Sequence, residues 1–98
     1  SVYSASKSSV QGMMRGLSVE LASKKIRVNA VLPGMTDTPI IYGSEFTEEQ
    51  LLSTKSQYPL KRAASPEEIA WAIIYFLSDA SGFTTGASLV VDGGFTVL

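Results

Sequence analysis

The sequence contains no cysteine and no histidine among its 98 residues. Disulfide bridges, thiolate nucleophiles, imidazole bases and the common zinc ligand sets are therefore excluded, and we expect no metal site. Any chemistry that these residues perform must come from oxygen and amine groups.

Charge and long apolar runs are also scarce. Charged residues make up 17% of the chain, the formal net charge is −1, and the eight Lys and Arg residues are scattered. This distribution offers no basic stripe for a phosphate backbone, so nucleic-acid binding is not expected. The longest apolar runs, residues 71–77 and 89–91, are far shorter than a membrane span, and the first residues show no signal-peptide pattern. We therefore expect a cytoplasmic protein that makes no membrane contact.

The rest of the composition is that of a small folded domain. Hydrophobic residues account for 45% of the sequence, which disfavours disorder. A chain of 98 residues makes at most one small domain. Its core is expected to be thin, because small domains bury a smaller share of their surface than large ones.

The spacing of apolar residues predicts a long amphipathic helix at the start of the chain. Apolar side chains recur three and four residues apart over residues 2–23. Gly12 and Gly16 lie inside this pattern, where each lowers helix propensity and permits another backbone to approach closely. We therefore expect this helix to be tightly packed.

Two further helices each start with a capping box. Residues 47–50 and 65–68 have a hydroxyl residue followed three positions later by Gln or Glu, which is the pattern of such a box. The first box predicts a short helix that ends near residue 56, and the second predicts a helix over residues 66–78. The second helix is apolar nearly all round, which is typical of a helix covered on more than one face.

Two short apolar segments predict strands. Residues 26–32 end at a Pro-Gly pair, and residues 87–91 end at an Asp-Gly-Gly turn. Neither alternates, which is typical of a parallel sheet with helices on both faces. Because two strands leave open edges and cannot enclose a core, we expect residues 1–98 to be part of a larger α/β domain.

A tyrosine and a lysine lie four residues apart in the first predicted helix. This spacing places Tyr3 and Lys7 on one face, about one turn apart. A phenol, with a pKa of about 10, is a poor acid–base catalyst at neutral pH, but a neighbouring ammonium group shifts its pKa toward the working range. The pair is therefore a candidate acid–base site, and an ordinary surface pair is the alternative.

A second candidate site follows the first predicted strand. Pro33 and Gly34 close this strand and place Met35, Thr36 and Thr38 at the carboxyl end of the sheet, where open α/β folds bind ligands. Thr36 and Thr38 can offer hydroxyl and backbone groups there. A plain strand-to-loop turn with solvated threonines is the alternative.

Taken together, these segments resemble the carboxyl-terminal half of a short-chain dehydrogenase/reductase. The resemblance is carried by a Tyr-x-x-x-Lys motif and by ordered segments that span nearly the whole chain: residues 3–7, 27–34, 59–62, 65–70, 76–79, 85–86 and 91–94. It implies a Rossmann-like, doubly wound parallel sheet, represented here by two strands, two main helices and one short lid helix.

The same resemblance implies hydride transfer between NAD or NADP and a carbonyl or alcohol substrate. Tyr3 would donate a proton in reduction or act as the base in oxidation. Lys7 would lower the pKa of Tyr3 and hold the ribose hydroxyls of the nicotinamide half. Residues 35–58 correspond to the substrate loop and lid of the family.

The resemblance also assigns residues to the cofactor and to the scaffold. Thr36 would lie near the carboxamide and Thr38 near the phosphates. Besides Tyr3 and Lys7, the implied cofactor-binding residues are Pro33, Gly34, Met35, Thr36 and Thr38. Three further residues match family positions and are interpreted as structural, in hydrogen bonding at the sheet end, in a loop and in a turn: Asn29, Arg62 and Asp92.

The glycine-rich phosphate loop and the catalytic serine of the family have no counterpart in these residues. No helix follows Gly93 and Gly94, so they are expected to form a turn and not a phosphate cradle. We expect the isolated chain to be inactive, to need a complementary amino-terminal half, and to form a homo-oligomer through the helix at 66–78 and the strand at 87–91. The alternative is a non-catalytic, self-associating α/β module that lacks the cofactor-binding half.

Overall fold

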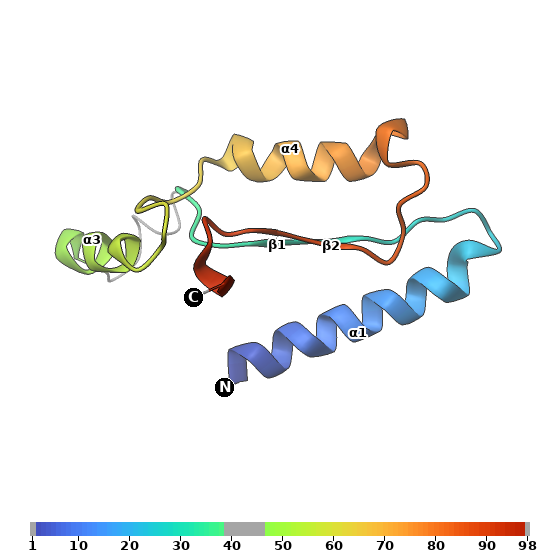
Figure 1. The fold of residues 1–98 in the computed structure, drawn as a ribbon, viewed down its shortest axis with the longest axis horizontal. Coiled ribbons are helices and arrows are strands. Elements are labelled where there is room, and N and C mark those ends of the chain that lie inside the picture. The colour runs from blue at the N-terminus through green and yellow to red at the C-terminus, as the bar shows by residue number, and fades with distance from the viewer. Residues whose placement is uncertain (1, 39–46, 98) are drawn as a thin grey trace.

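A computed structural model describes the backbone of residues 2–38 and 47–97, and the side chains of these residues from Ala5 onward. Two long helices, one short helix and two strands form, as the sequence predicts (Figure 1). In chain order the elements are α1 (Val2–Ala22), β1 (Ala30–Pro33), α3 (Glu48–Ser56), α4 (Pro66–Leu77), a 3₁₀ turn (Asp79–Ser81), β2 (Ser88–Val91) and a second 3₁₀ turn (Phe95–Val97).

The two strands form a parallel pair in which Ala30 lies opposite Ser88 and Pro33 lies opposite Val91. Parallel strands require a crossover connection, and α4 lies within it. In Figure 1, α4 covers one face of the sheet, α1 lies under the other, and α3 lies beyond the carboxyl ends of the strands. The predicted doubly wound α/β arrangement is confirmed.

β1 starts later than the sequence pattern predicts, because the Val28 N–H donates to Thr85 Oγ1 at 3.1 Å and not to a backbone partner in a ladder. Side chains of the same segment also bind the residues that precede β2. The Arg27 guanidinium donates to Ser81 Oγ at 2.8 Å. Asn29 Nδ2 donates to the Thr84 carbonyl oxygen at 3.0 Å, and Asn29 Oδ1 accepts from the Ala87 N–H at 3.0 Å. The strand prediction was therefore wrong for residues 26–29, whereas Asn29 does bond at the sheet end as expected.

Both predicted capping boxes are present. Thr47 Oγ1 accepts from the Gln50 N–H at 3.1 Å, and Gln50 Oε1 accepts from the Thr47 N–H at 2.9 Å. Ser65 Oγ accepts from the Glu68 N–H at 3.3 Å, and Glu68 Oε1 accepts from the Ser65 N–H at 2.9 Å. Each box satisfies N–H groups that the first turn of a helix leaves unpaired.

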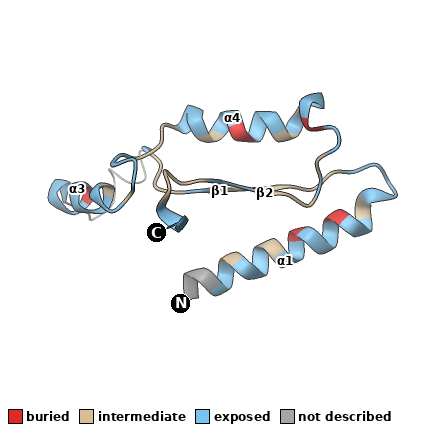
Figure 2. Cartoon of the chain, in the orientation of Figure 1, coloured by how far each residue is buried: buried red, intermediate tan, exposed pale blue. Residues whose placement is uncertain are grey.

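Few side chains are buried (Figure 2). Met14, Leu51 and Ala72 are the buried apolar residues among those that the structure describes. Apart from the adjoining residues and backbone of α1 itself, no described atom lies within 4 Å of a Cβ added to Gly12 or Gly16. The close packing predicted for α1 at these glycines is therefore absent, because no described element of this chain covers that side of the helix.

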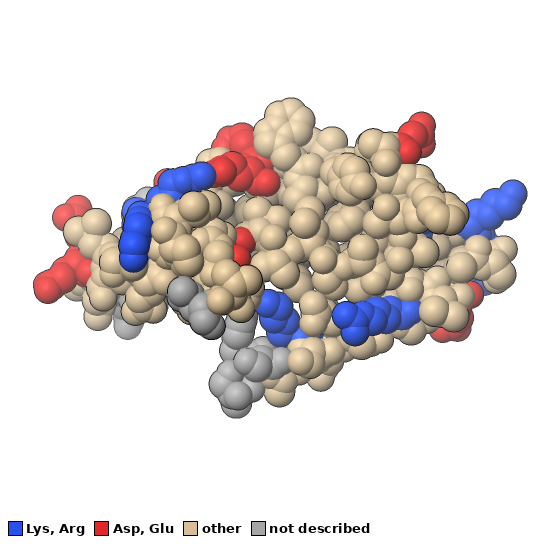
Figure 3. All heavy atoms as spheres, in the orientation of Figure 1, with Lys and Arg blue, Asp and Glu red and all other residues tan. Residues whose placement is uncertain are grey.

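α4 is apolar on its outer side as well as toward the sheet. Ala72 is buried, whereas Trp71 and Leu77 are 68% and 79% exposed. Few charged side chains lie over the body of this helix in Figure 3. Even so, no helix in the part of the chain that the structure describes is long and apolar enough to cross a membrane.

An ion pair joins the start of α4 to the loop before it. Arg62 Nη1 and Nη2 donate to Glu68 Oε1 and Oε2 at 2.7 and 2.9 Å. These bonds from Arg62, together with the hydrogen bond from the Ser65 backbone, lower the pKa of Glu68 from its usual 4.5 to about 2. A carboxyl group whose folded pKa is depressed stabilises the fold above its unfolded pKa, and this stabilisation is lost as the pH falls through the folded pKa.

We predict that Glu68→Gln removes this acid-sensitive contribution. The glutamine keeps an oxygen that can accept from the Ser65 N–H, so the variant loses the charge pair with Arg62 and retains the cap. Urea denaturation should show wild type more stable by a constant margin above about pH 5, with the margin shrinking toward zero near pH 2. A margin that does not change with pH would contradict the assignment.

Candidate active site

A cavity of about 300 Å³ lies at the carboxyl ends of the strands, where open α/β sheets bind ligands. Four segments line it: α1, the end of β1, the residue that follows the C-cap of α3, and the chain that follows β2. The lining residues are Lys7, Leu32, Pro33, Gly34, Tyr58, Asp92, Phe95 and Thr96. The structure thus brings together three residues that the sequence singled out, Lys7, Pro33 and Gly34.

Lys7 reaches this cavity from α1, and its side chain is half-buried. The backbone of Tyr3 belongs to the same helix, one turn earlier, but its side chain lies outside the described residues. Residues four apart on a helix share a face. That Tyr3 faces the cavity with Lys7 stays a prediction.

The segment after β1 is held as a short extension of the strand. The Gly34 N–H donates to the Val91 carbonyl oxygen at 3.0 Å. Beyond it, Thr36 forms an isolated parallel bridge with Ala64. Part of the predicted loop is therefore fixed by backbone hydrogen bonds.

Met35, Thr36 and Thr38, which are also predicted to bind the cofactor, are not among the lining residues of the large cavity. Met35 lines a second cavity of about 80 Å³, whereas Thr36 and Thr38 are among the lining residues of neither. Thr36 Oγ1 donates to the Gly34 carbonyl oxygen at 3.1 Å, so its proton is used within the chain. Residues 39–46 of the predicted lid lie outside the described residues.

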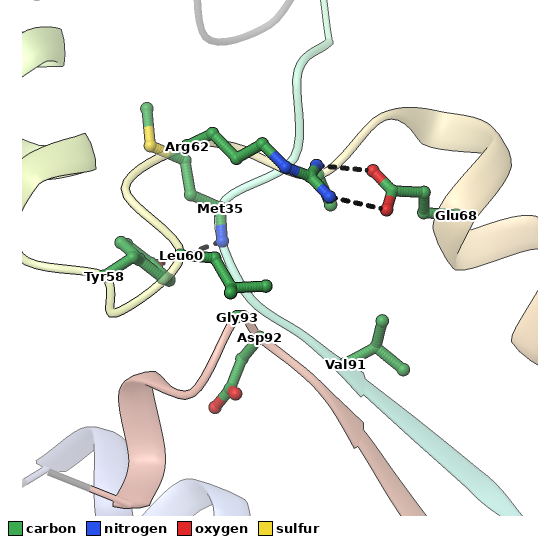
Figure 4. Close-up of a pocket in the computed structure, with 9 residues that line it drawn as sticks. Met35, Tyr58, Leu60, Arg62, Glu68, Val91, Asp92 and Gly93 are labelled. Atoms are coloured by element: carbon green, nitrogen blue, oxygen red, sulfur yellow. Dashed lines mark hydrogen bonds and ion pairs between the residues drawn. The ribbon is translucent and has the colours of Figure 1, made fainter.

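Figure 4 shows the small cavity. Its lining residues are Met35, Tyr58, Leu60, Arg62, Ala64, Glu68, Val91, Asp92 and Gly93. Tyr58 and Asp92 line both cavities. The two cavities therefore share these two residues.

Asp92 organises the turn after β2. Its Oδ1 and Oδ2 accept from the N–H groups of Gly94 and Thr96, both at 3.0 Å. Partial burial raises the pKa of Asp92, but the hydrogen bonds from Thr96 and Gly94 and the positive charge of Lys7 outweigh it and hold the pKa below its usual value. Asp92 thus has the structural role expected of it and also places a carboxylate near Lys7. Gly93 and Gly94 adopt φ values of 61° and 89°, as in the predicted turn.

Sequence reasoning did not assign two aromatic residues of the cavity. The rings of Tyr58 and Phe95 pack with centroids 4.8 Å apart and planes tilted by 32°. Tyr58 stands directly before the Pro59–Arg62 segment that carried part of the resemblance, and this position was the available signal. Nothing local identified Phe95, because its contact depends on how two distant loops meet.

The parallel strands with helices on both faces form a Rossmann-like α/β fold, and residues 1–96 match the family described as enoyl-(acyl carrier protein) reductase. The chain belongs to the short-chain dehydrogenase/reductase family, whose members use NAD or NADP. The carboxyl-terminal resemblance seen in the sequence is therefore confirmed.

Named relatives of this family cover nearly the whole chain. It is 43% identical, over its full length, to the cis-4-hydroxycyclohexanecarboxylate dehydrogenase of Sinomonas cyclohexanicum, of which the match covers 39%. It is 41% identical to the NADP-dependent (R)-specific alcohol dehydrogenase of Lentilactobacillus kefiri, over 96% of this chain and 38% of that protein. The 3-oxoacyl-[acyl-carrier-protein] reductase of Thermotoga maritima is 40% identical over 97% of this chain and 38% of its own length.

A solved structure agrees with the fold. The crystal structure of a short-chain dehydrogenase family protein from Francisella tularensis matches with a TM-score of 0.83 at 35% identity, over 98% of this chain and 43% of that one. The chain spans about two fifths of the length of the curated relatives it matches.

The large cavity fits one end of a nicotinamide dinucleotide. Lys7 brings an ammonium group with three N–H donors, which suits ribose hydroxyls. Pro33 and Gly34 bring strand-end backbone, and Tyr58 and Phe95 bring apolar ring surface. These groups are chemically suited to the nicotinamide and its ribose, and Lys7 is the one basic residue among the described residues that line the cavity.

Gly34 is required where β1 ends. A Cβ at this position would lie 2.9 Å from Asp92 Cα and 3.0 Å from Tyr58 Cε1. We predict that Gly34→Ala destabilises the fold by about 1–3 kcal/mol, because the Asp92 backbone cannot yield without shifting β2. Urea denaturation measures this change.

Gly12→Ala is the matched control. The same methyl group is added in α1, where no described atom beyond the adjoining residues and backbone of the helix lies within 4 Å of it. Because alanine is the better helix former, this variant should gain up to about 1 kcal/mol. Equal effects of the two substitutions would mean that the close approach at Gly34 is absent in solution.

Proposed function

We propose that the chain is the carboxyl-terminal portion of an oxidoreductase subunit that transfers a hydride between NAD or NADP and a carbonyl or alcohol substrate. The observation that carries the proposal is the cavity in which Lys7 meets the end of β1. Membership in the family and relatives named as alcohol dehydrogenase and reductase support it. The full-length subunit is the complete protein of which this chain would be the carboxyl-terminal portion.

In this proposal the chemistry is divided between the cofactor and α1. The cofactor, when bound, supplies or accepts the hydride. The Tyr3 hydroxyl donates a proton to the substrate carbonyl oxygen in reduction, and its phenolate accepts one from the alcohol in oxidation. The Lys7 ammonium, one turn away, stabilises the phenolate of Tyr3.

The strand end would hold the nicotinamide half. Lys7 would donate to the ribose hydroxyls, and Pro33, Gly34 and Met35 would line the ring. Because the Thr36 hydroxyl already donates to the Gly34 carbonyl oxygen, its oxygen would act as an acceptor toward the carboxamide. Thr38 would lie toward the phosphates.

The phosphate half would be bound by the rest of the subunit. The sequence shows no glycine-rich motif of the kind that forms, between a strand and a helix, the usual cradle for a pyrophosphate. We therefore infer that the 98-residue chain alone is inactive and gains cofactor affinity only from an amino-terminal portion.

We also propose that two subunits associate through α4 and β2. Trp71, Ile74 and Leu77 expose apolar surface on α4, at 68%, 50% and 79%. Leu89 and Val90 of β2 are 38% and 41% exposed beside it. A second copy of the same surface would cover both elements in a homo-oligomer.

Complementation tests the proposed function. The chain is titrated with NADH and NADPH, followed by nicotinamide fluorescence, alone and with the amino-terminal portion of the Thermotoga maritima reductase. We expect cofactor binding only in the mixture, because that portion supplies the phosphate cradle. A stable oligomer that ignores both nucleotides in the mixture would favour the non-catalytic module.

A second prediction concerns the phenol. In the full-length subunit, Tyr3→Phe should lower kcat at least about 100-fold, because the only atom lost is the one that exchanges the proton. Cofactor affinity, measured by the same fluorescence titration, should stay within about twofold. Retained turnover would exclude the role given to Tyr3.

A further inference from the structure

Tyr58 contacts two parts of the site from its position just after α3. Its hydroxyl accepts a hydrogen bond from the Met35 N–H at 3.0 Å, and its ring packs on Phe95. Figure 4 shows its side chain beside Met35 and Leu60. One side chain thus joins the segment after β1 to the turn after β2.

The bond from Met35 to Tyr58 differs in kind from its neighbours. The Met35 carbonyl oxygen accepts from the Ala64 N–H at 2.9 Å, and the Asp37 N–H donates to the Ala64 carbonyl oxygen at 2.8 Å. These are bonds between backbone groups, which any residue can form. The Met35 N–H is instead held by a side-chain hydroxyl, so the orientation of this peptide depends on the identity of residue 58.

The backbone of Tyr58 is itself fixed, so its hydroxyl is a well-placed acceptor. The Tyr58 N–H donates to the Lys55 carbonyl oxygen at 3.1 Å, and the Tyr58 carbonyl oxygen accepts from the Lys61 N–H at 2.8 Å. Lys55 belongs to α3, whose position is thereby linked to that of Met35. Because these two backbone hydrogen bonds already fix Tyr58, its hydroxyl loses little conformational entropy when it accepts from the Met35 N–H.

We propose that Tyr58 is a positioning residue for the cofactor, whose hydroxyl aligns the Gly34–Met35–Thr36 backbone for contact with the nicotinamide. The role rests on the proposed function, because that segment is the one assigned to the nicotinamide half. Removing the hydroxyl leaves the Met35 N–H without its acceptor and lets the peptide rotate. The ring contact with Phe95 does not depend on the hydroxyl.

Tyr58→Phe in the full-length subunit isolates this hydroxyl. Amide hydrogen exchange in the absence of nucleotide should become several-fold faster at Met35 and stay unchanged at Gly34, whose N–H donates to Val91. The Kd of NADH or NADPH, whichever wild type binds, should rise about three- to tenfold, as expected for the loss of one hydrogen bond. At saturating cofactor, kcat should stay within about twofold, the reverse of the pattern predicted for Tyr3→Phe.

Tyr75→Phe is the matched control, because it deletes the same atom on α4, away from both cavities. It should change neither exchange at Met35 nor cofactor affinity. A lowered melting temperature of Tyr58→Phe with an unchanged cofactor Kd would reduce Tyr58 to a structural residue and overturn the proposal. Unchanged exchange at Met35 would overturn it as well.

The two proposals fail in different ways. If wild-type full-length subunit binds neither nucleotide, the proposed function falls and the positioning role falls with it, even where exchange at Met35 responds to Tyr58→Phe. If wild type binds and turns over but Tyr58→Phe binds equally well, only the positioning role is lost.

Discussion

The parallel pairing of β1 and β2 is the constraint on which the rest of the structure depends. Strands that run in the same direction must end at the same edge, so the turns that follow them are forced together. Gly34 and Asp92 consequently approach within a distance that a side chain on residue 34 would not permit. α1, on the opposite face from α4, brings Lys7 to this edge.

The elements that could be predicted are those whose signals are local. The capping boxes at 47–50 and 65–68 each lie within four residues, and both form as the sequence indicates. The strand prediction was wrong for residues 26–29 because the local sequence does not reveal what these residues bind. Arg27 and Asn29 find their partners more than fifty residues further along the chain.

The same distinction applies to the site. Lys7 and Gly34 could be named because each lies in a short motif with a known geometry. The contact between Tyr58 and Met35, across 23 residues, could not, because it depends on how the chain folds back after α3. The proximity of Asp92 to Lys7 likewise depends on the placement of α1 against the sheet.

The turn after β2 lines the large cavity but takes no part in the pairing of the strands. Phe95 and Thr96 line the large cavity, yet they lie beyond the last pair of the ladder, Pro33 with Val91. Their side chains can change in size without breaking a strand-to-strand hydrogen bond. Changes at these two positions can therefore reshape the cavity while the paired strands persist.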